Sequence, residues 1–199
     1  MVKIKICGLS RLCDIEAANE EMPDYIGFVF AESRRKVTPA QALELRKALR
    51  PGIIAVGVFV NETAEHILSV AHNGIIDVIQ LHGCESEDYI ITLKKLTDKP
   101  VIKAAAVQKK GDARRWAASA ADYLLLDNKS GGSGRGFDWD LIDVIDKPYF
   151  LAGGLNADNI IEAIEKTKPF AVDVSSGVET DGLKDPAKIR DFIRRIRNG

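Results

Sequence analysis

The sequence has little of three features that would assign it to an obvious class. It has only three cysteines in 199 residues and no C-x-x-C pair, so neither a disulfide framework nor a zinc knuckle is expected. Its formal net charge of −1 lacks the basic surplus typical of proteins that bind nucleic acids or anionic membranes. No apolar run reaches membrane-spanning length, and the opening MVKIKICGLS lacks a signal-peptide core. We expect a cytoplasmic protein that partners neither nucleic acid nor a membrane.

Short β-rich runs alternate with longer amphipathic runs along the whole chain. We predict strands at residues 2–7, 25–30, 54–60, 77–82, 100–107, 122–127, 148–153 and 170–175. We predict helices at 38–49, 61–74, 86–96, 156–167 and 185–199, and weaker ones at 10–21, 111–119 and 139–145. Strands that alternate with helices pair in parallel through right-handed crossovers. The pattern predicts an α/β fold, a (β/α)8 TIM barrel forming a single compact domain over residues 1–199, with an open doubly wound sheet as the alternative.

A barrel would carry its chemistry at the C-terminal ends of its strands. Side chains alternate along a strand, and the apolar face of each predicted strand should pack against the helices. This alternation turns Cys7, His82 and Asp127 inward at the mouth of the barrel. It also places Lys5 one layer deeper, beside Asp173 on the last strand. Because an unpaired buried charge is costly, we hypothesise that these two residues form a buried ion pair.

Cys7 and Asp127 are a candidate pair of general base and general acid. Taken singly, such a cysteine is more often core filling and such an aspartate more often a helix cap. A thiol titrates near neutrality where a cation or backbone amides stabilise its thiolate, and we hypothesise that Lys5 and local amides lower the pKa of Cys7. His82 either contacts a ligand or makes a hydrogen bond in the core.

Glycine-rich turns follow the seventh and eighth predicted strands, where barrels commonly bind phosphate through backbone amides. The candidate binding residues in these turns are Gly153, Gly154, Ser175, Ser176 and Gly177. The simpler interpretation is two tight turns. A further glycine-rich stretch contains Gly132, and it either approaches an anion or is a flexible surface loop.

Other candidate substrate-binding residues lie in or just after the second, fourth and eighth predicted strands. They are Arg35, His82, Gly83 and Asp173. Arg35 lies in the run Arg34–Lys36, which would bind a carboxylate or phosphate if it faced the mouth. Such a run is more often a solvated surface segment.

Several short motifs, in order along the chain, resemble those of the phosphoribosylanthranilate isomerase family. They are KICGLS (5–10), GFVFAESRRKV (27–37), VGVFVN (56–61), QLHG (80–83), LLD (125–127), GGSGRGFDW (131–139), LAGGLNADNI (151–160) and VDVSSGVE (172–179). The chain departs from the family pattern at Ser10 and Ser133, where threonine is usual, and at Arg34, where proline is usual. Each motif is weak alone, but together they cover nearly the whole chain.

This resemblance implies a barrel isomerase of tryptophan biosynthesis that works without a metal or organic cofactor. Its reaction would be the Amadori rearrangement of N-(5-phosphoribosyl)anthranilate to 1-(2-carboxyphenylamino)-1-deoxyribulose 5-phosphate. The resemblance implies that Cys7 is the general base, Asp127 the general acid and Arg35 the arginine near the anthranilate carboxylate. The turns after the last two strands would hold the phosphate. The partner would be a small phosphoribosyl substrate, and the chain a monomer or homodimer.

Two alternatives stay open. One is another phosphosugar isomerase or epimerase on the same barrel, which the combination of Cys7, Asp127 and Arg35 disfavours. The other is a phosphate-ligand-binding protein without catalysis. Substitution of Cys7 and Asp127 tests the second alternative, because a binding protein would keep its binding and has no turnover to lose.

Overall fold

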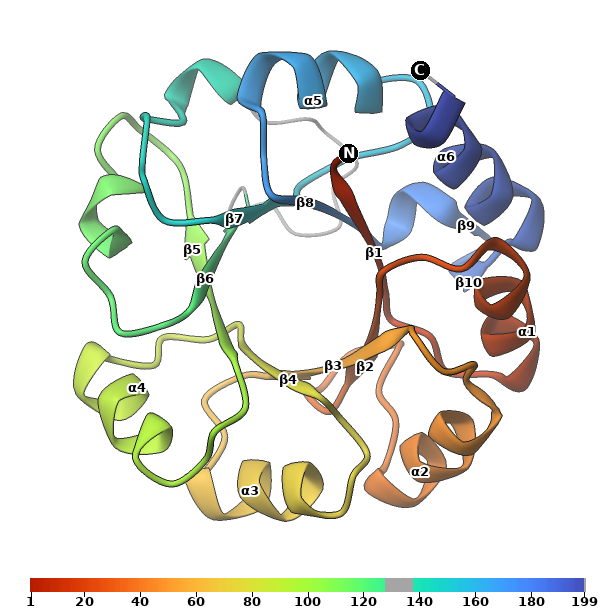
Figure 1. The fold of residues 1–199 in the computed structure, drawn as a ribbon, viewed down its shortest axis with the longest axis horizontal. Coiled ribbons are helices and arrows are strands. Elements are labelled where there is room, and N and C mark those ends of the chain that lie inside the picture. The colour runs from red at the N-terminus through yellow and green to blue at the C-terminus, as the bar shows by residue number, and fades with distance from the viewer. Residues whose placement is uncertain (128–137, 199) are drawn as a thin grey trace.

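The computed structural model describes residues 1–127 and 138–198, and parallel strands in it close into a barrel in chain order (Figure 1). The strands are β1 (Lys3–Cys7), β2 (Tyr25–Val29), β3 (Ile54–Phe59), β4 (Val78–Leu81), β5 (Val101–Ala106), β6 (Tyr123–Asp127), β7 (Tyr149–Leu151) and β8 (Ala171–Val174). β1 pairs with both β2 and β8, which closes the sheet. The predicted (β/α)8 barrel is confirmed, and each predicted strand range contains one of these strands.

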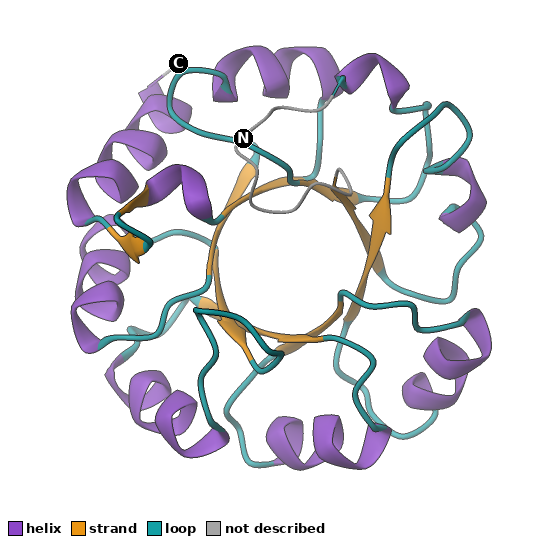
Figure 2. Ribbon diagram, turned by 180° about the vertical axis from the view of Figure 1, so that it is seen from behind, coloured by secondary structure: helices purple, strands orange, loops and turns teal. Residues whose placement is uncertain are grey.

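Helices form an outer ring around the strands (Figure 2). They are α1 (Leu12–Glu21), α2 (Pro39–Ala48), α3 (Ala64–His72), α4 (Glu87–Lys94), α5 (Ile160–Thr167) and α6 (Pro186–Asn198). Short 3-10 helices are η1 (Arg114–Trp116), η2 (Trp139–Leu141) and η3 (Ser176–Val178). Within the described part of the chain, no helix is long and apolar enough to span a membrane.

Two of the weaker helix predictions, 111–119 and 139–145, are wrong as α-helices, because each segment contains only a 3-10 turn. Nucleating a short helix costs more than its few hydrogen bonds return. The first segment begins at Gly111, whose φ is +94°, and the second contains β-branched Ile142, Val144 and Ile145, which have low helix propensity. Helix α3 starts at Ala64 rather than near Asn61, because Asn61 Oδ1 instead accepts the Cys84 amide at 2.7 Å.

The interior of the barrel is filled below its C-terminal end. Leu125 packs inside the barrel, whereas Leu124 and Leu126 pack outside it against the helices, as the alternation predicts. The Phe150 ring makes edge-on contacts with Tyr25 and Tyr123, at centroid distances of 5.3 and 5.8 Å. The base of the barrel is therefore a packed core, and chemistry is confined to the other end.

The predicted Lys5–Asp173 ion pair is confirmed. The two residues are register partners on β1 and β8, and Lys5 Nζ lies 2.9 Å from Asp173 Oδ1, with Lys5 wholly buried. Burial alone lowers the pKa of Lys5, but the charge and hydrogen bond of Asp173, with help from Cys7, raise it above its ordinary value. Lys5 therefore stays charged inside the barrel.

A second buried pair, absent from the sequence predictions, anchors the loop after β4. Lys103 Nζ donates to Gly83 O and to Glu85 Oε2, both at 2.7 Å, and lies 5.4 Å from the centre of the Trp116 ring. Both charged side chains are nearly inaccessible. Burial raises the pKa of Glu85, but Lys103 and the backbone amides of Asn61 and of Glu85 itself outweigh it, so that pKa is lowered. The pair fixes the loop that follows His82.

We predict that Lys103→Met lowers the free energy of unfolding by about 3–5 kcal/mol, because it leaves Glu85 as an unpaired buried charge. The control is Lys94→Met, which removes a partly exposed pair with Asp122 and should cost at most about 1 kcal/mol. Urea unfolding at pH 7 measures both. Equal losses in the two variants would contradict the prediction.

The stability difference between the parent and Lys103→Met should depend on pH, and its sign follows from the pKa of Glu85. Because the folded-state pKa of Glu85 is lowered, the pair stabilises the fold above the unfolded-state pKa and loses its effect as pH falls through the folded-state value. The difference in the free energy of unfolding between the parent and Lys103→Met should therefore become smaller as the pH falls.

Candidate active site

A cavity of about 260 Å³ opens at the C-terminal end of the barrel. Six predicted site residues line it: Cys7, Arg35, His82, Asp127, Asp173 and Ser175. They come from the ends of β1, β4, β6 and β8 and from the loop after β2. Tertiary structure thus brings together a thiol, two carboxylates, an imidazole and a guanidinium that are far apart in the sequence.

Cys7 ends β1, where two glycines make room for its neighbours. Its strand partner is Gly27, and a Cβ at Gly27 would lie 2.7 Å from Cys7 Sγ. Gly8 has a φ of +85°, and a Cβ there would lie 2.4 Å from Arg35 Cδ. The glycine after the cysteine therefore turns the chain away from the mouth and lets the arginine stem cover the strand end.

The net electrostatic effect on Cys7 differs from our hypothesis. Burial raises the pKa of Cys7, and Asp173 raises it further; Lys5 and Lys184 lower it, but not enough to offset the burial. Lys5 acts in the expected direction, yet the pKa of Cys7 is raised overall. Cys7 is therefore a neutral thiol at pH 7. No sequence pattern connects Lys184 with this site.

His82 lies between Gln80 and Asp127. Burial lowers the pKa of His82, Lys5 and Lys103 lower it further, and Asp173 partly opposes them, so the imidazole is neutral at pH 7. Gln80 Nε2 lies 2.9 Å from His82 Nδ1. Because that amide nitrogen can only donate, Nδ1 accepts and Nε2 carries the hydrogen. Nε2 lies 3.8 Å from Asp127 Oδ2, which is longer than a direct hydrogen bond.

The arginine run after β2 divides between cavity and surface. Arg35 lines the cavity and is 20% exposed, whereas Arg34 is 57% exposed. Both bind the buried carboxylate of Glu179. Glu179 lies on β9 (Glu179–Thr180), which pairs antiparallel with β10 (Leu183–Lys184). The strand predictions missed this hairpin, because two-residue strands are too short to show alternation.

The turns after β7 and β8 contact each other. Gly153 and Gly154 both have positive φ, at +88° and +69°. A Cβ at Gly177 would lie 1.9 Å from the carbonyl oxygen of Leu155 in the other turn, so no side chain fits there. Ser175 Oγ donates to the Cys7 carbonyl at 3.0 Å, and Ser176 begins η3. Gly132 lies outside the described residues.

Gly83 follows His82, at a point where the loop after β4 lies close to Asn61 in the loop after β3. A Cβ at Gly83 would lie 2.4 Å from Asn61 Oδ1, so only glycine fits beside that side chain. Among the residues that the structure describes, no group of three or more His, Cys, Asp or Glu side chains is arranged to hold a metal ion.

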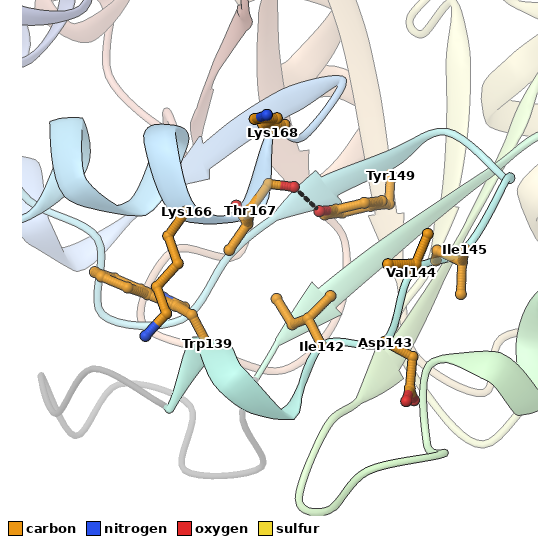
Figure 3. Close-up of a pocket in the computed structure, with 9 residues that line it drawn as sticks. All are labelled: Trp139, Ile142, Asp143, Val144, Ile145, Tyr149, Lys166, Thr167 and Lys168. Atoms are coloured by element: carbon orange, nitrogen blue, oxygen red, sulfur yellow. Dashed lines mark hydrogen bonds between the residues drawn. The ribbon is translucent and has the colours of Figure 1, made fainter.

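A second hollow, of about 380 Å³, lies between η2 and α5 (Figure 3). Figure 3 shows Trp139 and Lys166 on one side of it and the Tyr149 hydroxyl beside the Thr167 carbonyl. Lys166 Nζ lies 2.9 Å from Asp140 Oδ2. None of the predicted site residues lines this hollow, so it is separate from the candidate active site.

A closed (β/α)8 barrel with an acid, a thiol and an arginine at its C-terminal mouth defines the class of barrel proteins whose ligand sites are built on strand ends. The chain belongs to the N-(5'-phosphoribosyl)anthranilate (PRA) isomerase family, whose model matches residues 4–195. The resemblance inferred from the short motifs is thereby confirmed.

Relatives of known name match over the full length. A protein of Endomicrobium trichonymphae named N-(5'-phosphoribosyl)anthranilate isomerase is 48% identical over 202 residues, covering 100% of both chains. The crystal structure of phosphoribosyl anthranilate isomerase from Thermotoga maritima is 38% identical with a TM-score of 0.88, covering 100% of both chains. A crystal structure of such an isomerase in complex with reduced 1-(o-carboxyphenylamino)-1-deoxyribulose 5-phosphate is 36% identical with a TM-score of 0.85, again covering 100% of both chains.

We predict opposite shifts of the Cys7 pKa in two variants. Lys5→Met should raise it, because a stabilising cation is lost, and Asp173→Asn should lower it, because an opposing anion is lost. The rate of alkylation by iodoacetamide against pH measures the Cys7 pKa. A Cys13→Ser/Cys84→Ser background removes the two exposed thiols. Circular dichroism checks that each variant is folded, and a lowered pKa in Lys5→Met would contradict the prediction.

Proposed function

We propose that this chain, as one barrel domain over residues 1–199, catalyses the isomerisation of N-(5-phosphoribosyl)anthranilate in tryptophan biosynthesis. The observation that carries the proposal is that Cys7 and Asp127 line one cavity, together with Arg35, in a chain that belongs to the PRA isomerase family. The full-length relative of the same name and the related structure with a reduced product bound support it.

Asp127 is the proposed general acid. Protonated, it gives its proton to the ring oxygen of the ribose as the bond from that oxygen to C1 breaks, and the nitrogen lone pair forms a Schiff base. His82, with Nε2–H facing Asp127 at 3.8 Å, donates toward the carboxylate that remains. A neutral imidazole suits this role, because its N–H stabilises the negative charge left on Asp127 without adding a competing acid.

Cys7 is the proposed general base. Its thiolate takes the proton from C2 of the Schiff base, and the resulting enolamine tautomerises to the ketone of the product. Since the pKa of Cys7 is raised, only a minor fraction is thiolate at pH 7. We therefore expect kcat/KM to increase with pH through neutrality, as the thiolate fraction grows.

Arg35 and the two glycine-rich turns are the proposed anchors for the ends of the substrate. The guanidinium offers to the anthranilate carboxylate the edge that does not bind Glu179. Backbone amides in the turns after β7 and β8 hold the phosphate; these turns carry Gly153, Gly154, Ser175, Ser176 and Gly177. His82, Gly83 and Asp173 complete the proposed substrate contacts, and Gly132 remains part of the proposal on resemblance alone.

The test uses N-(5-phosphoribosyl)anthranilate generated in situ, whose consumption is followed by fluorescence. The parent should consume it, and Cys7→Ala and Asp127→Asn should each lose about 10²–10⁴-fold in kcat, the usual contribution of a general acid or base. Cys84→Ala is the matched control, because its thiol is exposed, and it should retain full activity.

Two outcomes would overturn this proposal. Binding of the substrate by the parent without turnover would indicate a binding protein. Near-normal kcat in Cys7→Ala or Asp127→Asn would remove the role assigned to that residue.

A further inference from the structure

Glu179 is a buried carboxylate surrounded by three cations. Its side chain is only 4% exposed. Arg35 Nε lies 2.6 Å from Oε1 and Arg35 Nη2 lies 2.8 Å from Oε2, so the two side chains meet fork to fork. Arg34 Nη2 adds a contact of 2.8 Å to Oε2, and Lys184 Nζ binds Oε1. One negative charge faces three positive ones, so the cluster keeps a net positive charge beside the cavity.

This contact determines where the arginine head points. The Arg35 stem lies over Gly8, where a Cβ would come within 2.4 Å of Cδ. The head is held at its Nε edge by Glu179. Among the described residues, Arg35 Nη1 makes no hydrogen bond, while the side chain lines the cavity that contains Cys7. A carboxylate at one edge of the guanidinium therefore leaves the other edge for a ligand.

The same carboxylate is linked to the strand that carries the thiol. Lys184 Nζ donates to Ser175 O at 3.0 Å, and Ser175 Oγ donates to Cys7 O at 3.0 Å. The hairpin β9–β10 supplies both Glu179 and Lys184 as paired residues. It therefore packs against both the Arg35 head and the end of β1.

We propose that Glu179 is a positioning residue that aims Arg35 at the carboxylate of the substrate, and so sets the preference for an N-glycoside of an aromatic amino acid over one of a plain aromatic amine. This inference rests on the proposed function, in which Arg35 binds that carboxylate. Glutamine at this position has one acceptor oxygen, so it binds one arm of the fork and presents an NH2 group to the other cations.

The experiment compares two substrates that differ only in the carboxylate: N-(5-phosphoribosyl)anthranilate and N-(5-phosphoribosyl)aniline, formed from ribose 5-phosphate and aniline. For Glu179→Gln we expect kcat/KM on the first to fall roughly ten- to hundredfold, mostly through KM, as for a lost charge-assisted contact. On the second, kcat/KM should change less than about threefold, because no carboxylate is there to be aimed at. Glu179→Asp should recover part of the loss, since it restores a carboxylate.

The matched control is Glu21→Gln. Glu21 is also a nearly buried carboxylate that binds arginines, with Arg190 Nε at 2.9 Å and Arg194 Nη2 at 3.3 Å, but it joins α1 to α6 on the outside of the barrel. The Glu21→Gln variant should have a lower free energy of unfolding than the parent, and the ratio of kcat/KM between the two substrates should stay unchanged.

A second variant, Arg35→Lys, keeps the inference testable if Glu179→Gln does not fold, because a lysine cannot fill the fork. Arg35→Lys should lose the same preference for the substrate with the carboxylate. Where both single variants fold, the double variant Glu179→Gln/Arg35→Lys should lose no more kcat/KM on that substrate than the worse single variant. Equal losses on both substrates, or a parent that does not distinguish them, would overturn the inference while the proposed function stands. A parent that converts neither substrate would overturn the proposed function, and this inference with it.

Discussion

The ion pair between Lys5 and Asp173 lies across the seam where the first and last strands close the barrel. Both charges are buried, and an unpaired buried charge costs several kcal/mol. A shift of register between β1 and β8 would separate them and leave both unpaired. The observed register also places Cys7 two residues further along β1 and Ser175 two residues beyond Asp173, just past the end of β8, one layer higher on the same inward face. The position of the thiol thus depends on the pair below it.

Paired buried charges also hold the parts of the mouth that strands do not carry. Lys103 and Glu85 fix the loop after β4 from outside the barrel, and Glu179 fixes the arginine that follows β2. Each pair joins a strand or hairpin to a loop at the mouth of the barrel. A side chain held by a bidentate or fully buried contact loses little further freedom when a ligand binds, which is the physical basis of a pre-organised site.

Prediction from sequence succeeded where a local pattern, such as alternation along a strand, was compatible with only one structure. Alternation along the strands turned Cys7 and Asp127 inward, and the barrel rule placed them at the same end. It failed for segments 111–119 and 139–145, because short amphipathic runs form helices only when packing favours them. It made no prediction for Glu179, because no local pattern shows that the hairpin after the last strand folds this residue against Arg35.

The sequence by itself determined the strand segments, the inward face of the first, fourth, sixth and eighth strands, the seam ion pair and the family, because period-two alternation and motif order are properties of the linear chain. Only the tertiary structure decided the balance of charges around Cys7. Burial raises the pKa of that thiol more than Lys5 and Lys184 lower it, and Lys184 reaches the site from a hairpin that follows the last barrel strand. Desolvation and the summed effect of charges from distant segments exist only once the chain is folded.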